Sequence, residues 1–199
     1  MTQKCLKSQN ENQCKKIRGN YSSYLHIIRR FNMSNYHGIE ENSILNGVGV
    51  RTVLWFSGCS HRCSGCHNYT TWDKCGGKKF DENAMSELLQ TLSYEWISGL
   101  TISGGDGLMP YNVDATIEVC KKVKEVYPHL TIWIYTGYTY EEVMQNEKRR
   151  KAVELCDVLV DGKFIKELSS PNKKWVGSEN QRVIDVKKSF ELNQVVLFD

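Results

Sequence analysis

The chain has 199 residues, 40% of them hydrophobic and 25% charged, which is the balance of an ordinary globular domain. No apolar run approaches the roughly 18 residues of a transmembrane helix, and the N-terminus lacks the apolar stretch of a signal peptide. Composition therefore argues against a membrane protein and predicts a cytoplasmic one. The length suffices for one domain with its own core and no disulfide staples.

The positive charge is concentrated at the N-terminus. The net charge is +3, but residues 1–32 hold 7 basic side chains and 1 acidic one, which gives +6 there and leaves −3 for residues 33–199. The first segment is polar and rich in Asn, Gln, Ser and Lys, so we predict a poorly ordered extension followed by a single domain. Nothing in the domain indicates a nucleic-acid surface.

Four short runs of strand character follow one another along the domain. The first, residues 51–57 (RTVLWFS), comes after a turn-rich segment and is mostly apolar, as expected of a strand buried on both faces of a parallel sheet. The other three are residues 100–103, 131–135 and 157–160, and each is followed closely by a glycine.

Helical patterns separate these strands. Asp81 is a plausible N-cap, and the apolar residues from Met85 to Leu92 repeat at helical spacing. Residues 112–126 and 140–153 predict two further helices. The alternation of strands and helices predicts an α/β fold with a mostly parallel sheet and right-handed crossovers.

The last third of the chain, residues 163–199, shows strand candidates at 182–186 and 194–198 but no clear helix. Because a closed eight-stranded βα barrel usually needs about 250 residues, we expect an open, partial barrel.

Three cysteines follow the first predicted strand in the sequence GCSHRCSGCHN. The spacing of Cys59, Cys63 and Cys66 suits the ligands of a 4Fe-4S cluster. Three thiolates in one loop leave one iron of such a cluster without a protein ligand, and an open coordination site admits a substrate or cofactor. The loop lies at the carboxyl end of its strand, where ligand sites of α/β sheets are found.

Two other readings of these cysteines remain open from spacing alone. A zinc site would need a fourth ligand, which His61, His67 or Cys75 could supply, and disulfides would need an oxidising compartment. The cysteines outside the triplet lack metal-like spacing and are expected to be free thiols: Cys5, Cys14, Cys75, Cys120 and Cys156.

Five sequence blocks together resemble the radical S-adenosylmethionine superfamily. They read NGVGVRTVLWFSGCSHRCSGCHNYTTWD, SGGDGL, YTGYT, VDGKF and NQRVID. Within the superfamily they are most similar to the activating proteins of anaerobic ribonucleoside-triphosphate reductase. The resemblance covers most of residues 33–185, and the first two blocks are its specific part.

The resemblance implies an enzyme with a 4Fe-4S cluster and S-adenosyl-L-methionine as cofactors. In that family the methionine amine and carboxylate chelate the open iron, and an electron from the cluster cleaves the cofactor to a 5'-deoxyadenosyl radical. The radical removes a hydrogen atom from a backbone glycine of the reductase. The implied partners are therefore the large subunit of that reductase and an electron donor such as flavodoxin.

Carried over to this sequence, the resemblance makes Cys59, Cys63 and Cys66 the cluster ligands. Gly65 and His67, together with Cys66, would border the adenine end of S-adenosylmethionine. No catalytic residue is implied beyond the ligands of the cluster and cofactor.

The strand ends supply the other implied cofactor contacts. Gly104 and Gly105 would contact the methionine moiety, since a backbone without side chains can approach a ligand closely. Asp106 would accept a hydrogen bond near the ammonium group, and Thr136 lies past the end of a neighbouring strand.

The sequence departs from the superfamily pattern at two glycines. Gly65 stands where an aromatic residue is usual, which favours the reductase-activating branch, and Gly107 stands where proline is usual. Two alternatives remain: an activating enzyme of pyruvate formate-lyase or another glycyl-radical enzyme, and a non-catalytic zinc or iron-sulfur binding module.

Overall fold

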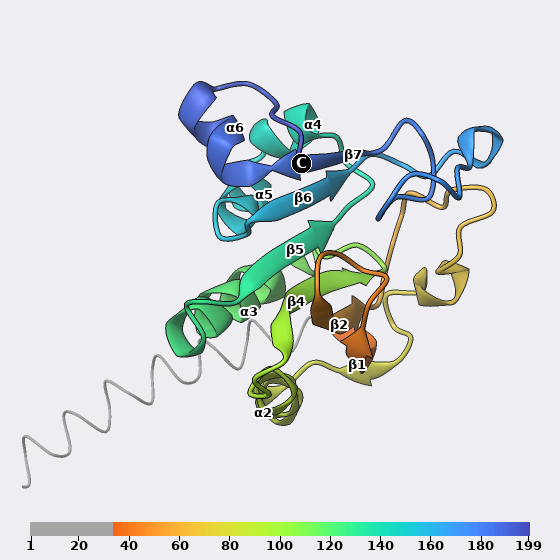
Figure 1. Ribbon diagram of the computed structural model, residues 1–199. Coiled ribbons are helices and arrows are strands. Elements are labelled where there is room, and N and C mark those ends of the chain that lie inside the picture. The colour runs from red at the N-terminus through yellow and green to blue at the C-terminus, as the bar shows by residue number, and fades with distance from the viewer. Residues whose placement is uncertain (1–33) are drawn as a thin grey trace, which may run out of the picture.

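Within residues 34–199 the chain forms one seven-stranded sheet (Figure 1). The computed structural model describes residues 34–199, so the predicted N-terminal extension lies outside the described residues. The strands are β1 (Asn35–Ser43), β2 (Val50–Phe56), β3 (Lys78–Lys79), β4 (Ile97–Gly104), β5 (Thr131–Tyr135), β6 (Val158–Asp161) and β7 (Arg182–Asp185).

The centre of the sheet is parallel. Its order is β3-β1-β2-β4-β5-β6-β7; β2, β4, β5 and β6 pair in parallel, whereas β1 and β7 pair antiparallel with their neighbours. In the described residues β3 and β7 form two separate edges, so the sheet is not closed. The predicted α/β fold with an open sheet is confirmed, and all four predicted strands before residue 163 are present.

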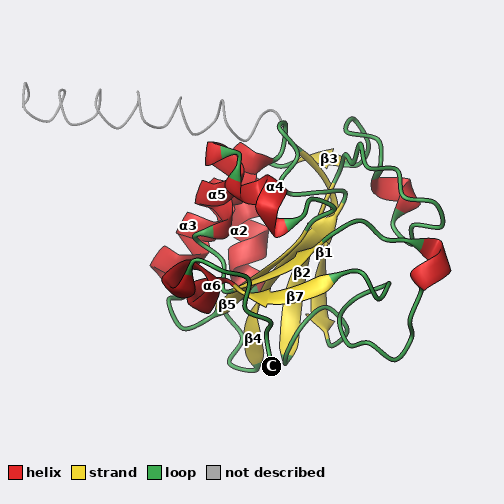
Figure 2. Cartoon of the chain, turned by 90° about the horizontal axis from the view of Figure 1, so that it is seen from above, coloured by secondary structure: helices red, strands yellow, loops and turns green. Residues whose placement is uncertain are grey.

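Most of the helices cover one face of this sheet (Figure 2). A large apolar core lies where the first helices meet the buried strands, and it includes Leu54, Ile102 and Val119, none of which is exposed. The predicted cap at Asp81 is confirmed, because its side chain accepts a hydrogen bond from the Ala84 amide at 3.0 Å. The helices are α2 (Glu82–Thr91), α3 (Val113–Val126), α4 (Tyr140–Met144), α5 (Glu147–Val153) and α6 (Val186–Leu192), with 3-10 turns at Tyr69–Thr71 and Lys166–Leu168.

The helix predicted over residues 140–153 is interrupted. Asn146 adopts an extended conformation and its side chain accepts from the Arg149 amide at 3.1 Å, so it ends one helix and caps the next. Asparagine competes for backbone hydrogen bonds in this way, which is why it favours helix ends.

The predictions for the last third of the chain, residues 163–199, were partly wrong. A helix, α6, follows β7 directly, and Asp185 caps it by accepting from the Lys188 amide at 3.0 Å. Its sequence, VKKSFEL, is too short and polar to show an apolar repeat. The strand predicted over 194–198 is reduced to one bridge between Ile184 and Leu197.

The sheet face away from helix α3 carries a smaller aromatic cluster. Trp133 is 1% exposed and meets the rings of Trp175 and Phe198, each with centroids 5.3 Å away and edge-on. Two segments from the C-terminal part of the chain therefore pack onto this face. No helix within residues 34–199 is long and apolar enough to cross a membrane.

Candidate active site

The register of the parallel strands brings two predicted site loops together. Trp55 lies beside Ser103 and Phe56 beside Gly104, so the cysteine loop and the glycine turn leave the sheet next to each other. The amide of Gly105 donates to the Phe56 carbonyl at 2.7 Å. The two loops are thus joined by backbone hydrogen bonds before any side chain contributes.

This close approach explains the glycine pair sterically. A Cβ atom at Gly105 would lie 2.5 Å from the carbonyl oxygen of Gly58, and one at Gly104 would lie 2.7 Å from that of Phe56. Gly104 also has φ of +95°, a backbone conformation that favours glycine. Packing between the two loops therefore requires both glycines, whatever they contact in a cofactor.

The predicted site residues mostly share one cavity. Its volume is about 520 Å³, within the range of small-molecule sites. Two of the predicted residues stand apart from it: Gly65 is exposed on the loop, and Asp106 is buried behind the wall with 1% exposure. The predicted residues that line the cavity are Cys59, Cys63, Cys66, His67, Gly104, Gly105 and Thr136.

Asp106 ties three loops together. One carboxylate oxygen accepts from the Thr136 hydroxyl at 2.8 Å and from the Gly137 amide at 3.0 Å, and it lies 3.0 Å from His61 Nε2. The other oxygen accepts from the Leu108 amide at 2.8 Å. Protein donors thus surround the carboxylate, while its predicted contact with a cofactor ammonium remains a prediction.

His61 was considered in the sequence only as a possible zinc ligand. Its ring packs edge-on against Tyr138 with centroids 4.6 Å apart, and a Cβ at Gly137 would lie 2.4 Å from a ring carbon. Gly137 therefore makes room for this histidine. No local signal in the sequence could have paired it with Asp106, which lies 45 positions away.

Burial makes Cys59 and Cys63 weaker acids than an ordinary cysteine. It raises the pKa of Cys59 to about 11, with the nearby charge of Asp106 as the next contribution. Burial also raises the pKa of Cys63. Since metal ligands must be thiolates, metal loading at these positions releases protons.

Among residues 34–199, no three side chains of His, Cys, Asp or Glu converge closely enough to hold one metal ion. Cys75, Cys120 and Cys156 are free thiols as predicted, and the other two predicted free cysteines lie outside the described residues.

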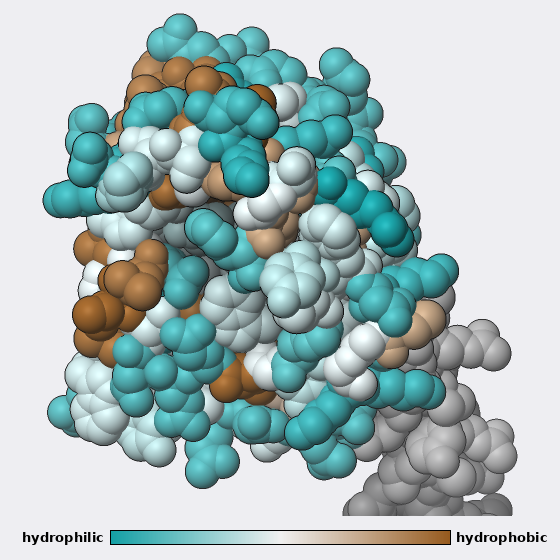
Figure 3. All heavy atoms as spheres, turned by 90° about the vertical axis from the view of Figure 1, so that its right-hand side faces the viewer, coloured by the Kyte–Doolittle hydropathy of each residue, from teal (hydrophilic) through white to brown (hydrophobic). Residues whose placement is uncertain are grey.

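The far wall of the cavity comes from segments in which the sequence analysis named no site residue. In Figure 1 the yellow cysteine loop and the blue segment after β6 lie on the same side of the molecule. Figure 3 looks onto that side, which is mostly hydrophilic with separate hydrophobic groups. The additional lining residues include Leu45, Asn46, Phe164, Trp175 and Gln181.

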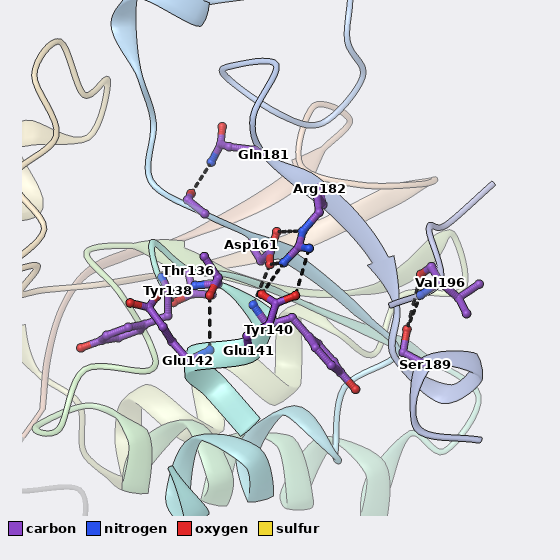
Figure 4. Close-up of polar contacts among 12 residues, drawn as sticks. Thr136, Tyr138, Tyr140, Glu141, Glu142, Asp161, Gln181, Arg182, Ser189 and Val196 are labelled. Carbon is purple, nitrogen blue, oxygen red and sulfur yellow. Dashed lines mark hydrogen bonds and ion pairs between the residues drawn. The ribbon is translucent and has the colours of Figure 1, made fainter. Parts of the chain in front are cut away.

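A second polar network fixes the backbone where β6 ends (Figure 4). Asp161, 1% exposed, accepts from the Tyr140 amide at 2.7 Å and from the guanidinium of Arg182. Arg182 also donates to both oxygens of Glu141, at 2.9 and 3.1 Å. These hydrogen bonds raise the pKa of Arg182, and its guanidinium lowers the pKa of Glu141 to about 2.

The comparisons with known proteins cover most of the described chain. The family profile described as a 4Fe-4S single cluster domain matches residues 45–184. The chain is 41% identical to the anaerobic ribonucleoside-triphosphate reductase-activating protein of Enterobacteria phage T4, over 75% of this chain and 92% of that protein.

Two bacterial relatives with the same name extend the match. Identity is 40% with the protein of Pasteurella multocida (strain Pm70), over 74% of this chain and 94% of that one. It is 38% with the protein of Escherichia coli (strain K12), over 75% of this chain and 97% of that one. Similarity at this level over nearly the whole of each relative shows that the chain belongs to the family of anaerobic ribonucleoside-triphosphate reductase-activating proteins.

Proposed function

We propose that this protein places a glycyl radical on the anaerobic ribonucleoside-triphosphate reductase, using a 4Fe-4S cluster and S-adenosylmethionine. The observation that carries the proposal is the cavity of about 520 Å³ that has three cysteines on its wall and lies in the region matched by a 4Fe-4S profile. The names of the relatives supply the target.

The proposal assigns one iron each to Cys59, Cys63 and Cys66. The remaining iron would face the cavity and be open to S-adenosylmethionine. Gly104 and Gly105 line the cavity beside the cysteine loop, where the methionine end of the cofactor would lie.

The remaining cofactor contacts are proposed in the cysteine loop and at the end of the neighbouring strand β5. Gly65 and His67 would border the adenine, and Thr136 lines the wall at the end of β5. Asp106 would hold these loops in place, and its carboxylate would also accept a hydrogen bond from the cofactor ammonium.

The fold proposed for this chemistry is a partial barrel of the radical S-adenosylmethionine type. When bound, the cluster would supply the electron that cleaves S-adenosylmethionine, and the resulting carbon radical would take a hydrogen atom from a backbone glycine of the reductase. The chain itself binds and orients the reactants and limits access of water. A sheet with open edges leaves room for a protein segment to enter, which a closed barrel would not.

The test is anaerobic reconstitution with iron and sulfide, followed by mixing with S-adenosylmethionine, a reductant such as reduced flavodoxin, and the reductase. Electron paramagnetic resonance should then detect a glycyl radical on the reductase. A radical on pyruvate formate-lyase instead would favour the alternative target.

A pair of cysteine variants tests the ligand assignment. Cys63→Ala should lose both the brown chromophore and the cleavage of S-adenosylmethionine. Cys75→Ala is the matched control, because this exposed thiol lies nearby in the chain but outside the cavity lining, and it should retain both. Cleavage retained in Cys63→Ala would refute the assignment.

A further inference from the structure

The segment between β1 and β2 presents aliphatic side chains to solvent. Ile44 is 70% exposed, Leu45 79% and Val48 46%. In Figure 1 this orange segment loops in front of the strands. Three large aliphatic side chains exposed within five residues are unusual on the surface of a protein that works alone.

The exposure is imposed by contacts beneath the segment. The side chain of Arg51 is fully buried there and donates to the Val48 carbonyl at 3.1 Å and to the Thr101 hydroxyl at 2.7 Å. That hydroxyl donates in turn to the Asn46 carbonyl at 2.7 Å. Gly47 packs so closely on Arg51 and Trp133 that a Cβ there would lie within 3 Å of both. The backbone is therefore held in a form that turns the aliphatic side chains outward.

An exposed aromatic pair adjoins this segment. Tyr94 and Trp96 stack with centroids 4.7 Å apart and planes 8° from parallel, and they are 41% and 58% exposed. The indole of Trp96 donates to the side chain of Asn42, at the end of β1, at 2.7 Å. We call the five exposed side chains the apolar rim: Ile44, Leu45, Val48, Tyr94 and Trp96.

The apolar rim begins at the cavity. Leu45 lines the cavity wall while most of its side chain remains in solvent, so the two surfaces are continuous. Exposed acidic residues, Glu41 and Glu95, stand beside the rim in the sequence. An apolar and aromatic centre with a charged border is the pattern of a protein–protein interface.

We propose that the apolar rim is the docking surface for the reductase, an inference that rests on the proposed function. The atom to be attacked belongs to the backbone of another protein, so that protein must insert a segment into the cavity. Its surface next to the inserted segment must then cover the cavity wall at Leu45, from which the rim extends toward the start of β4. The complementary surface on the reductase is expected to be apolar with a basic border.

Single substitutions in the apolar rim test this. We choose Ile44→Asp and Trp96→Ala, because neither residue lines the cavity. Leu192→Asp is the matched control, since Leu192 is an aliphatic residue 60% exposed on α6. Two quantities are measured for each protein: cleavage of S-adenosylmethionine with reductant but without reductase, and the Kd for the reductase.

Both rim variants should cleave S-adenosylmethionine at the wild-type rate while their Kd for the reductase rises about tenfold or more, as for the loss of a central interface residue. The control should match the wild type in both. An unchanged Kd in both rim variants would overturn the proposed docking surface but leave the proposed function standing. A wild-type protein that cleaves S-adenosylmethionine yet places no radical on the reductase would overturn the proposed function, and the docking inference with it.

Discussion

Two buried aspartates lie at the carboxyl edge of the same sheet, and the protein holds them in different ways. Asp106 and Asp161 are each 1% exposed. Asp106 accepts from a hydroxyl and two amides and lies beside His61. Asp161 accepts from one amide and from the guanidinium of Arg182, which also binds Glu141.

The difference follows from what each aspartate connects. Asp106 joins the cysteine loop to the segments after β4 and β5, and all three segments contribute to the cavity wall. Asp161 joins the end of β6 to the start of α4 and to β7, where its guanidinium partner begins the edge strand. We therefore expect substitutions at Asp161 to act mainly on stability and those at Asp106 to act mainly on activity.

The largest loss of stability is expected for Asp161→Ala. The change removes the buried partner of Arg182 and leaves the Tyr140 amide without its acceptor. Breaking such a pair should lower the free energy of unfolding by about 3 kcal/mol, because one charged partner and one amide lose their interaction. Urea unfolding at pH 7 measures this, and a midpoint equal to that of the wild type would contradict it.

Asp106→Asn should destabilise the folded protein less than Asp161→Ala does, but it should reduce activity more. Its amide nitrogen cannot accept, so at least one of the donors around the side chain loses its partner, at a cost of about 2 kcal/mol. Because three cavity segments depend on this carboxylate, cleavage of S-adenosylmethionine should fall about tenfold or more.

Asp161→Asn is the matched control for that experiment. It makes the same chemical change in an equally buried position away from the cysteine loop, so the folded variant should retain its rate of cofactor cleavage. Equal rates in the two asparagine variants would remove the distinction between the two aspartates.

Thr136→Val should also lower the free energy of unfolding, by less than Asp106→Asn does. Valine keeps the shape but removes the hydroxyl that donates to Asp106 at 2.8 Å and accepts from the Tyr138 amide at 3.2 Å. The expected loss is about 1 kcal/mol of unfolding free energy, because Asp106 keeps its other donors. Thermal unfolding measures it, and a loss as large as that of Asp106→Asn would mean that the hydroxyl holds the network by itself.

Local patterns in the sequence were enough to predict the four parallel strands and the shared position of the cysteine and glycine loops, but not β1 or β3. The apolar runs and the glycine turns are short-range signals, and parallel pairing brings strand ends to one edge. The cap at Asp81 is likewise a contact over three positions.

Contacts between distant residues could not be predicted in this way. Asp161 and Arg182 are 21 positions apart, and the pairing depends on how β7 returns beside β6. The burial of Arg51 could not be predicted either, because in the sequence it is only a polar residue within a mostly apolar strand. Its hydrogen bonds go to groups from three separate segments, and only the folded chain brings them together.

The smallest expected effect is at Glu141, the exposed end of the second network. Its side chain is 57% exposed, so Glu141→Gln should cost less than about 1 kcal/mol at pH 7. Arg182 lowers the pKa of Glu141 from 4.5 to about 2. A carboxyl with a lowered pKa stabilises the folded state fully above its unfolded pKa and loses that contribution as pH falls through its folded pKa. The difference in unfolding free energy between wild type and variant, measured by urea unfolding at pH 7 and at pH 3, should therefore be smaller at pH 3. If that difference in unfolding free energy does not change with pH, Arg182 is held by Asp161 alone, and Glu141 is not part of the second network.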